Sequence, residues 1–255
     1  MQVFQSRGAE IAFIDLPPTG EDRDEPIVLV HGFASNHVVN WGSTLWTQTL
    51  TRDGRRVVAL DNRGHGQSQK FHDPAAYSLI AMSFDVIDLM DHLGIAAADV
   101  MGYSMGARIT SFLAVEHPGR LRSAILGGLG MRLLTSDANY LEIVAAMEAP
   151  SLADLSDPMQ KTFRAFAEQT KSDLAALAAC MRGTRELLSA DEAAAIRVPV
   201  LVAAGTKDPL ARDYRELAAF IPGAQVLEIP GRDHNLAVGD KAYKEGVLEF
   251  LRRRP

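Results

Sequence analysis

The stretch Gly102-Tyr103-Ser104-Met105-Gly106 decides the fold, because it places a serine where an unusual backbone turn has to hold it. The apolar segment 98–101 precedes it, and a segment with the pattern of an inward-facing helix, residues 107–115, follows it. A strand, a G-x-S-x-G turn and a helix form the context of a nucleophile elbow. The glycines let neighbouring backbone pack without a Cβ clash, and a helix beginning at Met105 directs its free N–H groups toward the serine. We therefore predict a nucleophilic Ser104 at the tip of a tight turn.

The bulk composition is that of an ordinary globular protein. The chain has 255 residues, of which 47% are hydrophobic and 23% charged, and this length suits one α/β domain with a modest insertion. Its formal net charge is −6, and the clustered arginines 252–254 end the last predicted helix, where cations suit the helix dipole. Because no basic stripe is visible, we expect no nucleic-acid partner.

The single cysteine and the start of the chain bear on location. Cys180 cannot form an intramolecular disulfide, which is typical of a reducing compartment, and its neighbours indicate a buried structural thiol. Residues 1–6 lack a basic region followed by an apolar core, and no run approaches the roughly 18 apolar residues of a membrane span. We expect a cytoplasmic protein with no signal peptide and no membrane span.

Strand-like and helical patterns alternate along most of the chain. Residues 3–6 and 10–16 alternate like the strands of a hairpin. Apolar runs typical of strands covered on both faces follow at residues 27–30, 57–60, 100–101, 124–126, 198–204 and 226–229. Helical stretches lie at residues 44–52, 79–93, 105–116, 211–220 and 241–251. This alternation predicts an α/β fold with a mostly parallel, doubly wound sheet of eight strands.

The alternation stops over residues 131–195, where helix signals replace strand signals. Asp157 followed by proline is typical of an N-cap and first turn, and the stretch starting at Ser189 matches a capping box. We predict a small all-helical insertion at 131–195 in an α/β core made of residues 1–130 and 196–255.

The chain also carries an acid and a base in the positions that a serine nucleophile requires. A serine hydroxyl is a weak nucleophile until a base accepts its proton, and an acid must fix the tautomer of that base. In this topology both follow the serine, each in a loop at the carboxyl end of a later strand. Asp208 follows the apolar run 198–204, and His234 follows the run 226–229. We interpret Ser104, Asp208 and His234 as a catalytic triad.

The competing candidates for base and acid have structural interpretations. Asp233 is adjacent to His234, so its side chain should point elsewhere, and Asp213 is expected inside a helix. The other six histidines are assigned as helix-ending (His92, His117), surface loop (His37, His72), a brace for the loop after the first buried strand (His31) and part of a turn (His65).

Acyl transfer also requires donors for the negative charge that develops on the substrate oxygen. Met105, directly after the serine, supplies one backbone N–H. The second should come from the loop His31-Gly32-Phe33-Ala34, and we assign it to the N–H of Phe33. The alternative for this loop is a plain turn that ends a strand.

Five ordered motifs together resemble the α/β-hydrolase superfamily. They are Val30-His31-Gly32-Phe33, Asp61-Asn62-Arg63-Gly64-His65-Gly66-Gln67-Ser68, Gly102-Tyr103-Ser104-Met105-Gly106, Gly205-Thr206-Lys207-Asp208 and Gly231-Arg232-Asp233-His234. The resemblance covers the chain except the helical insertion, which looks like the cap that roofs the pocket in that family. It implies that the motif at 61–68 is a structural turn. The H-G-F form of the first motif is similar to the esterase branch.

The resemblance implies a serine hydrolase that cleaves carboxylic esters through an acyl-enzyme intermediate, with no cofactor and no metal. Haloalkane dehalogenases and most epoxide hydrolases of the fold carry aspartate at the nucleophile position, so Ser104 argues against both. Carbon–carbon bond hydrolases and enol-lactone hydrolases use the same triad and stay open as alternatives. A cofactor-free haloperoxidase and a non-catalytic receptor are further, less favoured alternatives.

The substrate pocket is the least determined part. Met159, Phe163 and Phe166 are spaced i, i+4 and i+7, which fits either an acyl pocket or plain packing of a lid helix, and Trp41 and Met131 are further pocket candidates. No basic cluster in the insertion is arranged for a polyanionic substrate, which favours small to medium, neutral or apolar esters. A substrate that carries a carboxylate would need a cation, for which these residues are available: Arg132, Arg164, Arg182 and Arg185.

Overall fold

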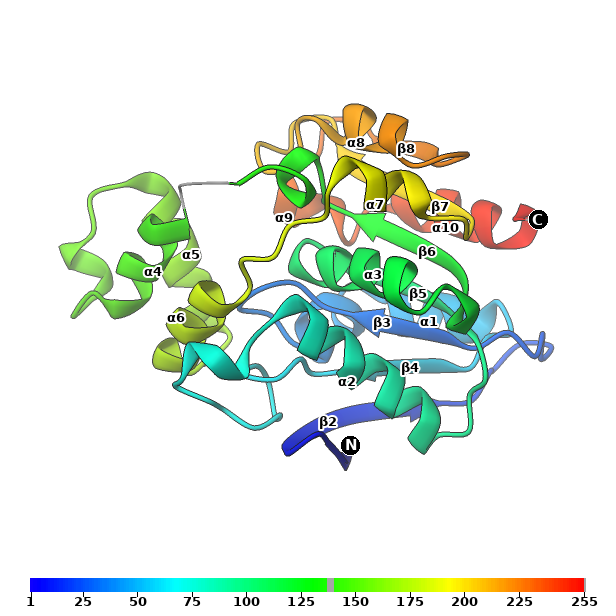
Figure 1. Cartoon of the computed structure of the whole chain (residues 1–255), viewed down its shortest axis with the longest axis horizontal. Coiled ribbons are helices and arrows are strands. Elements are labelled where there is room, and N and C mark those ends of the chain that lie inside the picture. Colours follow the sequence, from blue (N-terminus) through cyan, green and yellow to red (C-terminus); the bar gives the residue numbers. More distant parts are fainter. Residues whose placement is uncertain (137–139, 255) are drawn as a thin grey trace.

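The computed structural model describes residues 1–136 and 140–254, which form an α/β structure around one sheet (Figure 1). The strands are β1 (Gln2–Ser6), β2 (Ala9–Leu16), β3 (Ile27–Val30), β4 (Val57–Leu60), β5 (Ala98–Tyr103), β6 (Leu121–Gly127), β7 (Val200–Gly205) and β8 (Gln225–Ile229). Their order in the sheet is β1-β2-β4-β3-β5-β6-β7-β8. The pairs β1–β2 and β2–β4 are antiparallel, and all other neighbours are parallel. The predicted eight-stranded, mostly parallel sheet is confirmed.

The helices follow the predicted pattern closely. In the core they are α1 (Trp46–Arg52), α2 (Leu79–His92), α3 (Met105–Glu116), α8 (Tyr214–Phe220), α9 (His234–Ala237) and α10 (Lys241–Arg253), and in and after the insertion α4 (Tyr140–Glu148), α5 (Pro158–Gln169), α6 (Leu174–Gly183) and α7 (Ala190–Ala195). Short turns are the π-helical η1 (Val38–Gly42) and the 3-10 turns η2 (Pro74–Ala76), η3 (Pro118–Arg120), η4 (Met131–Leu133) and η5 (Leu152–Asp154). Within the described residues, no helix is long and apolar enough to cross a bilayer.

The sheet separates two hydrophobic cores. Along β3, Val28 and Val30 belong to the core that contains α2, α3 and α8, whereas Ile27 and Leu29 belong to the core that contains α1 and α10. Successive side chains of a strand point to opposite faces, so a run of four apolar residues supplies both cores at once. This explains why the central strands are continuously apolar, and it gives the doubly wound arrangement visible in Figure 1.

Helices α4, α5 and α6 form a helical insertion beyond one end of the sheet (Figure 1). Helix α4 packs on both α5 and α6, while α7 lies against α3 and α8 of the core. The Asp157 side chain caps α5 through the N–H of Gln160, and Ser189 with Glu192 forms the predicted capping box on α7. The predicted helical insertion is confirmed, while its boundaries at residues 131 and 195 stay a prediction.

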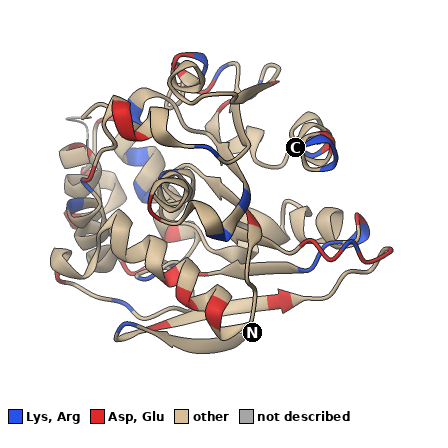
Figure 2. Ribbon diagram, turned by 45° about the vertical axis from the view of Figure 1, so that its right-hand side comes forward, with Lys and Arg blue, Asp and Glu red and all other residues tan. Residues whose placement is uncertain are grey.

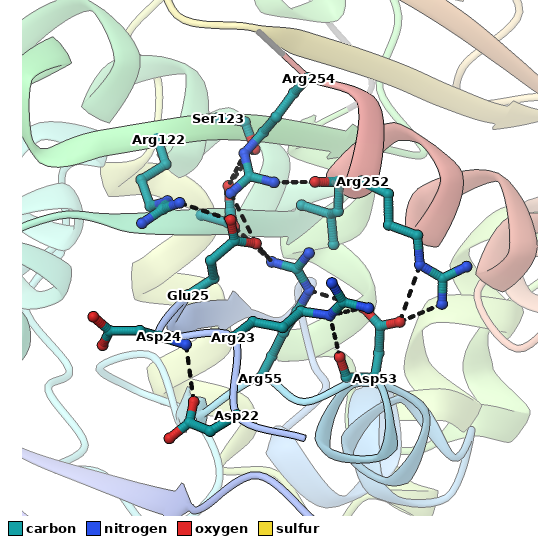
Figure 3. A network of polar contacts seen from close by, with 12 residues as sticks. Asp22, Arg23, Asp24, Glu25, Asp53, Arg55, Arg122, Ser123, Arg252 and Arg254 are labelled. Carbon is teal, nitrogen blue, oxygen red and sulfur yellow. Dashed lines mark hydrogen bonds and ion pairs between the residues drawn. The ribbon is translucent and has the colours of Figure 1, made fainter. Parts of the chain in front are cut away.

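Acidic and basic residues are interspersed along the chain, including the helix that ends at the C-terminus (Figure 2). Several of them meet in the network drawn in Figure 3. The guanidinium of Arg55, whose side chain is 0% exposed, lies 2.7 Å from Glu25, 3.2 Å from Asp53 and 3.1 Å from Asp99. Arg254 lies 3.0 Å from Asp99. Removing one partner of a buried ion pair is strongly destabilising, so these buried charges need one another. The network joins the segment before β3, the start of β5 and the end of α10.

Candidate active site

Ser104 occupies a strained turn between β5 and α3. Its backbone has φ 54° and ψ −113°, a conformation that residues other than glycine rarely adopt and that costs about 1–3 kcal/mol. The turn is held because the Ser104 N–H donates to the Gly127 carbonyl at 2.8 Å and the Ala107 N–H donates to the Ser104 carbonyl at 3.0 Å. This is the strand–turn–helix geometry expected of a nucleophile elbow.

Asp208 and His234, 26 residues apart in sequence, lie in direct contact. His234 Nδ1 is 2.7 Å from Asp208 Oδ2. The other carboxylate oxygen, Oδ1, accepts the N–H groups of Leu210 and Ala211 at 2.8 and 3.2 Å, which fixes the acid in a site where Asp208 is 2% exposed. With Nδ1–H donating to the carboxylate, the ring presents Nε2 as a proton acceptor.

His234 and Ser104 line the same cavity. The His234 ring packs against Tyr103, with centroids 5.3 Å apart, and the Tyr103 hydroxyl donates to the His234 carbonyl at 2.6 Å. Among the described residues, no hydrogen bond joins the Ser104 hydroxyl to His234. Catalytic hydrogen bonds of this kind often form fully only when substrate is bound.

Asp233 points elsewhere, as expected from its position next to His234. Its Oδ1 accepts the N–H groups of Asn235 and Leu236 and so caps α9, whose first residue is His234. The sequence patterns did not indicate this four-residue helix. Because His234 is the first residue of α9, this helix and its Asp233 cap fix the backbone that carries the imidazole.

The two assigned oxyanion donors border Ser104. A Cβ added to Gly32 would lie 3.4 Å from the Cβ of Ser104, so the loop after β3 runs directly beside the serine. The N–H groups of Phe33 and Met105 have no hydrogen-bond partner anywhere in the described ranges 1–136 and 140–254. Two unpartnered donors next to a hydroxyl can stabilise an oxyanion that develops there.

Buried polar contacts hold the loop after β3. His31 is fully buried; its Nδ1 lies 2.8 Å from the Gly32 carbonyl, and its Nε2 accepts the Asn62 N–H at 2.9 Å. Burial lowers the pKa of His31, so the ring stays neutral and keeps this donor and acceptor assignment. The interpretation of His31 as a brace agrees with this geometry.

The interpretation of His37 as a surface residue is wrong. His37 is 8% exposed, and its backbone N–H and its Nδ1 lie 2.7 and 2.8 Å from Asp61 Oδ1. Burial alone would raise the pKa of Asp61, but the hydrogen bonds from His37 and from the Gln67 N–H, together with nearby His31, lower it to about 2. The motif at 61–68 therefore supports the loop after β3, a role that its local turn pattern did not reveal.

The cavity has a volume of 620 Å³, with walls formed by the loops after β3, β5, β7 and β8 and by α5. Met159, Phe163 and Phe166 line it from α5, the position proposed for them from their spacing. The Phe163 ring lies 6.3 Å from the ring of Phe33, so the insertion contacts the loop that carries one oxyanion donor.

Two pocket predictions are wrong. Trp41 is fully buried and packs edge-on against Trp46 at 6.4 Å in the core that contains α1 and α10, because the π-helical turn η1 directs its side chain toward the sheet. Met131 packs against the other core and does not line the cavity. Sequence reasoning missed the loop residues that line it instead: Val39, Asn40, Thr44, Leu210 and Val238.

A second, smaller cavity of 110 Å³ also reaches Ser104. It shares Phe33, Phe163 and Leu210 with the larger one. Arginines 108, 132 and 185 contribute to its wall. The two other arginines considered from the sequence lie elsewhere: Arg164 donates to the Ala146 and Ala149 carbonyls and Arg182 pairs with Glu148.

The family model for the alpha/beta hydrolase fold matches residues 25–187, more than half of the chain. The chain belongs to the alpha/beta hydrolase fold family. The matched segment runs from β3 through the elbow into the insertion, and the eight-stranded sheet with its helical insertion agrees with this assignment.

Three similar proteins illustrate the range of similarity. Epoxide hydrolase B of Mycobacterium tuberculosis is 33% identical over 126 residues, 49% of this chain and 34% of that protein, so the alignment spans about a third of the relative. Non-heme chloroperoxidase CPO-A1 of Kitasatospora aureofaciens is 27% identical over 96% of this chain and 97% of its own. The solved enol-lactonase of Burkholderia xenovorans superposes with a TM-score of 0.82 at 25% identity, covering 99% of this chain and 100% of its own.

Proposed function

We propose that this alpha/beta hydrolase is a serine hydrolase that cleaves carboxylic esters through an acyl-enzyme intermediate. The observation that carries the proposal is the strained elbow of Ser104 in one cavity with His234, whose Nδ1 pairs with Asp208. A non-glycine residue that combines φ 54° with ψ −113° lies outside the left-handed helical region and persists only where the surrounding structure enforces it. Such strain is typical of residues whose side chain has to be presented for reaction.

Each group has a defined role in the proposed reaction. Ser104 Oγ attacks the ester carbonyl, and His234 Nε2 accepts the hydroxyl proton while Asp208 stabilises the imidazolium. The N–H groups of Phe33 and Met105 hold the oxyanion. His234 then protonates the departing alkoxide, and a water molecule attacks the acyl-enzyme to release the acid and restore the serine.

The larger cavity supports a substrate with an apolar portion. Met159, Phe163 and Phe166 project from α5 into it, and its 620 Å³ accommodates a small to medium group. Burial of apolar surface contributes about 25 cal/mol per Å², so a hydrocarbon or aryl portion gains affinity there without any charged partner.

Other reactions of the fold use the same groups. Carbon–carbon bond hydrolysis and enol-lactone hydrolysis remain the alternative hypotheses for this site. The similarity to a chloroperoxidase and to an enol-lactonase is compatible with reactions other than ester hydrolysis. The similarity to an epoxide hydrolase does not favour that reaction here, because Ser104 rather than an aspartate stands at the elbow of this chain.

The test is a series of p-nitrophenyl acyl esters compared with enol lactones and vinylogous acids. We expect saturable ester turnover, with kcat reduced about 10³-fold or more in Ser104→Ala, because the triad acts as a unit. Ser111→Ala is the matched control, since its hydroxyl donates to the Ala107 carbonyl within the same helix. Near-normal turnover by Ser104→Ala would overturn the proposal, and faster turnover of vinylogous acids or enol lactones would favour the alternative.

A further inference from the structure

Tyr103 links the nucleophile to the base of the candidate active site. It is the last residue of β5 and directly precedes Ser104. Its hydroxyl donates to the backbone carbonyl of His234 at 2.6 Å, and its ring centroid lies 5.3 Å from that of the imidazole. One side chain on the strand of the nucleophile therefore contacts both the backbone and the ring of a histidine 131 residues further along the chain.

The Tyr103 hydroxyl is suited to hold that carbonyl at every pH at which a histidine acts as a base. Tyr103 is buried, and burial raises the pKa of its hydroxyl well above the ordinary value of 10. The hydroxyl therefore stays protonated and keeps its proton for donation. The nearby carboxylate of Asp208 acts in the same direction, because it disfavours a tyrosinate beside it.

The backbone after β6 leaves no spare room beside the two rings. A Cβ added to Gly128 would lie 2.9 Å from Tyr103 Cζ and 3.0 Å from His234 Cε1. The preceding residue, Gly127, accepts the Ser104 N–H through its carbonyl at 2.8 Å. The same two residues thus hold the elbow and border both rings, so that a displacement of the tyrosine is felt by the histidine.

A second aromatic donor holds the other end of α9. Trp46 Nε1 donates at 2.6 Å to the carbonyl of Val238, the residue at the C-cap of this helix. The buried ring of Tyr243 packs against both donors, with centroids 5.0 Å from Trp46 and 6.3 Å from Tyr103. Three aromatic side chains therefore support α9, and two of them donate hydrogen bonds to its backbone.

Such support matters because α9 is only four residues long. A helix of this length is not stable by itself and takes its position from tertiary contacts. The imidazole has to come within about 2.6–3.2 Å of the serine hydroxyl for proton transfer, and a misplacement of about 1 Å can cost about 10²-fold in rate. Asp208 fixes the ring through Nδ1, whereas Tyr103 ties the backbone of the histidine to the strand that carries the nucleophile.

We propose that Tyr103 is a positioning residue for the base, whose hydroxyl holds the first turn of α9 so that His234 Nε2 stays within reach of Ser104 Oγ. The proposal rests on the proposed serine hydrolase mechanism and adds to it a residue that acts through His234. The role belongs to the hydroxyl rather than to the ring. Loss of the hydroxyl alone should therefore slow proton transfer in both acylation and deacylation, since His234 serves both steps.

The kinetic test compares two tyrosine-to-phenylalanine variants with p-nitrophenyl acetate as substrate. Tyr103→Phe keeps the ring and its packing but removes the hydrogen bond to His234. Tyr243→Phe is the matched control, because its buried hydroxyl has no partner within the described part of the chain. We expect kcat to fall about 10-fold or more in Tyr103→Phe with KM changed less than about twofold, and both to stay near the wild-type values in Tyr243→Phe. Equal kcat in the two variants, or a loss confined to KM, would overturn the positioning role.

Hydrogen–deuterium exchange gives a readout that needs no turnover. Amides of the peptide that covers α9 should exchange at least several-fold faster in Tyr103→Phe than in the wild type and in Tyr243→Phe, while the peptide that covers α3 should be unchanged. Ester turnover by the wild type with unchanged kcat in Tyr103→Phe would overturn the positioning role and leave the proposed function standing. Faster exchange of α9 in a protein without any ester turnover would support the hold of Tyr103 on α9 and overturn the proposed function. Unchanged exchange of α9 would overturn the positioning role whatever the esters show.

Discussion

Gly102 and Gly106 pack backbone against backbone around the serine between them. A Cβ added to Gly102 would lie 2.1 Å from the Gly106 carbonyl oxygen, and a Cβ added to Gly106 would lie 1.9 Å from the carbonyl oxygen of Val30. Real Cβ atoms do not approach backbone that closely. The two glycines therefore bring β5, β3 and the first turn of α3 together, which is the physical reason for the G-x-S-x-G spacing.

Replacing the second of these glycines should destabilise the protein. Gly106→Ala forces β3 and α3 apart, and we expect the free energy of unfolding in urea to fall by about 2 kcal/mol or more. Gly119→Ala is the control, since a Cβ there meets nothing within 4 Å, and it should change stability by less than about 1 kcal/mol. Equal stability of the two variants would contradict the close packing of the elbow.

Substitutions of Asp208 and of Asp233 should differ sharply in their effect on catalysis. Asp208→Asn keeps an oxygen for the N–H groups of Leu210 and Ala211 but loses the charge that stabilises the His234 imidazolium, so kcat should fall about 10²- to 10⁴-fold. Asp233→Asn retains its cap on α9 and should retain most activity. Steady-state ester kinetics measure kcat for both variants. A larger loss of kcat in Asp233→Asn than in Asp208→Asn would refute the assignment of Asp208.

The burial of His65 predicts that the free energy of unfolding falls in acid. Burial, reinforced by repulsion from His31, lowers the pKa of His65 from 6.5 to about 3. The unfolded chain therefore binds this proton first, so the contribution to stability is complete above about pH 6.5 and is lost as the pH falls toward 3. Between about pH 7 and pH 5 the loss should be about 2 kcal/mol from His65 alone.

Urea unfolding at several pH values measures this slope. His65→Gln should make the slope shallower over that interval, because the buried ring whose pKa is lowered is then absent. An unchanged slope in His65→Gln would show that the buried ring does not govern the acid sensitivity.

The network of Figure 3 should matter for stability far more than a surface ion pair. Arg55→Gln removes the fully buried cation of the network, while Arg252 stays beside Asp53 and Arg254 beside Asp99. The cost should therefore approach, without exceeding, the loss of about 3–5 kcal/mol that follows from breaking a buried ion pair. Arg253→Gln removes only an exposed pair with Glu249 and should cost less than about 1 kcal/mol. Comparison of the two unfolding free energies checks this, and similar small losses would show that the network contributes little.

Local patterns were sufficient to predict the fold, and they led to the candidate triad, of which the structure pairs His234 with Asp208. The run 27–30 is apolar at every position because it faces two cores, and Ser104 lies in a spacing that only a tight turn satisfies. Parallel strands place their carboxyl ends at one edge, so Asp208 and His234 could be placed near the serine before their contact was known.

The lining of the pocket could not be predicted in the same way. Trp41 and Val39 lie two residues apart, yet one is buried in the core and the other lines the cavity, because the π-helical turn sets their directions. The partners of His37 and Arg108 lie 24 and 76 or more residues away in sequence, so no local spacing indicates them. Such contacts follow from the tertiary packing alone.

Covalent labelling of Ser104 tests the central claim most directly. Reaction with a fluorophosphonate, followed by intact-mass and peptide mass spectrometry, should show one adduct per chain on the peptide that contains Ser104, with loss of ester turnover in proportion to labelling. Ser104→Ala should take up no label. A fully active protein that stays unlabelled, or one whose adduct lies on another residue, would contradict the account.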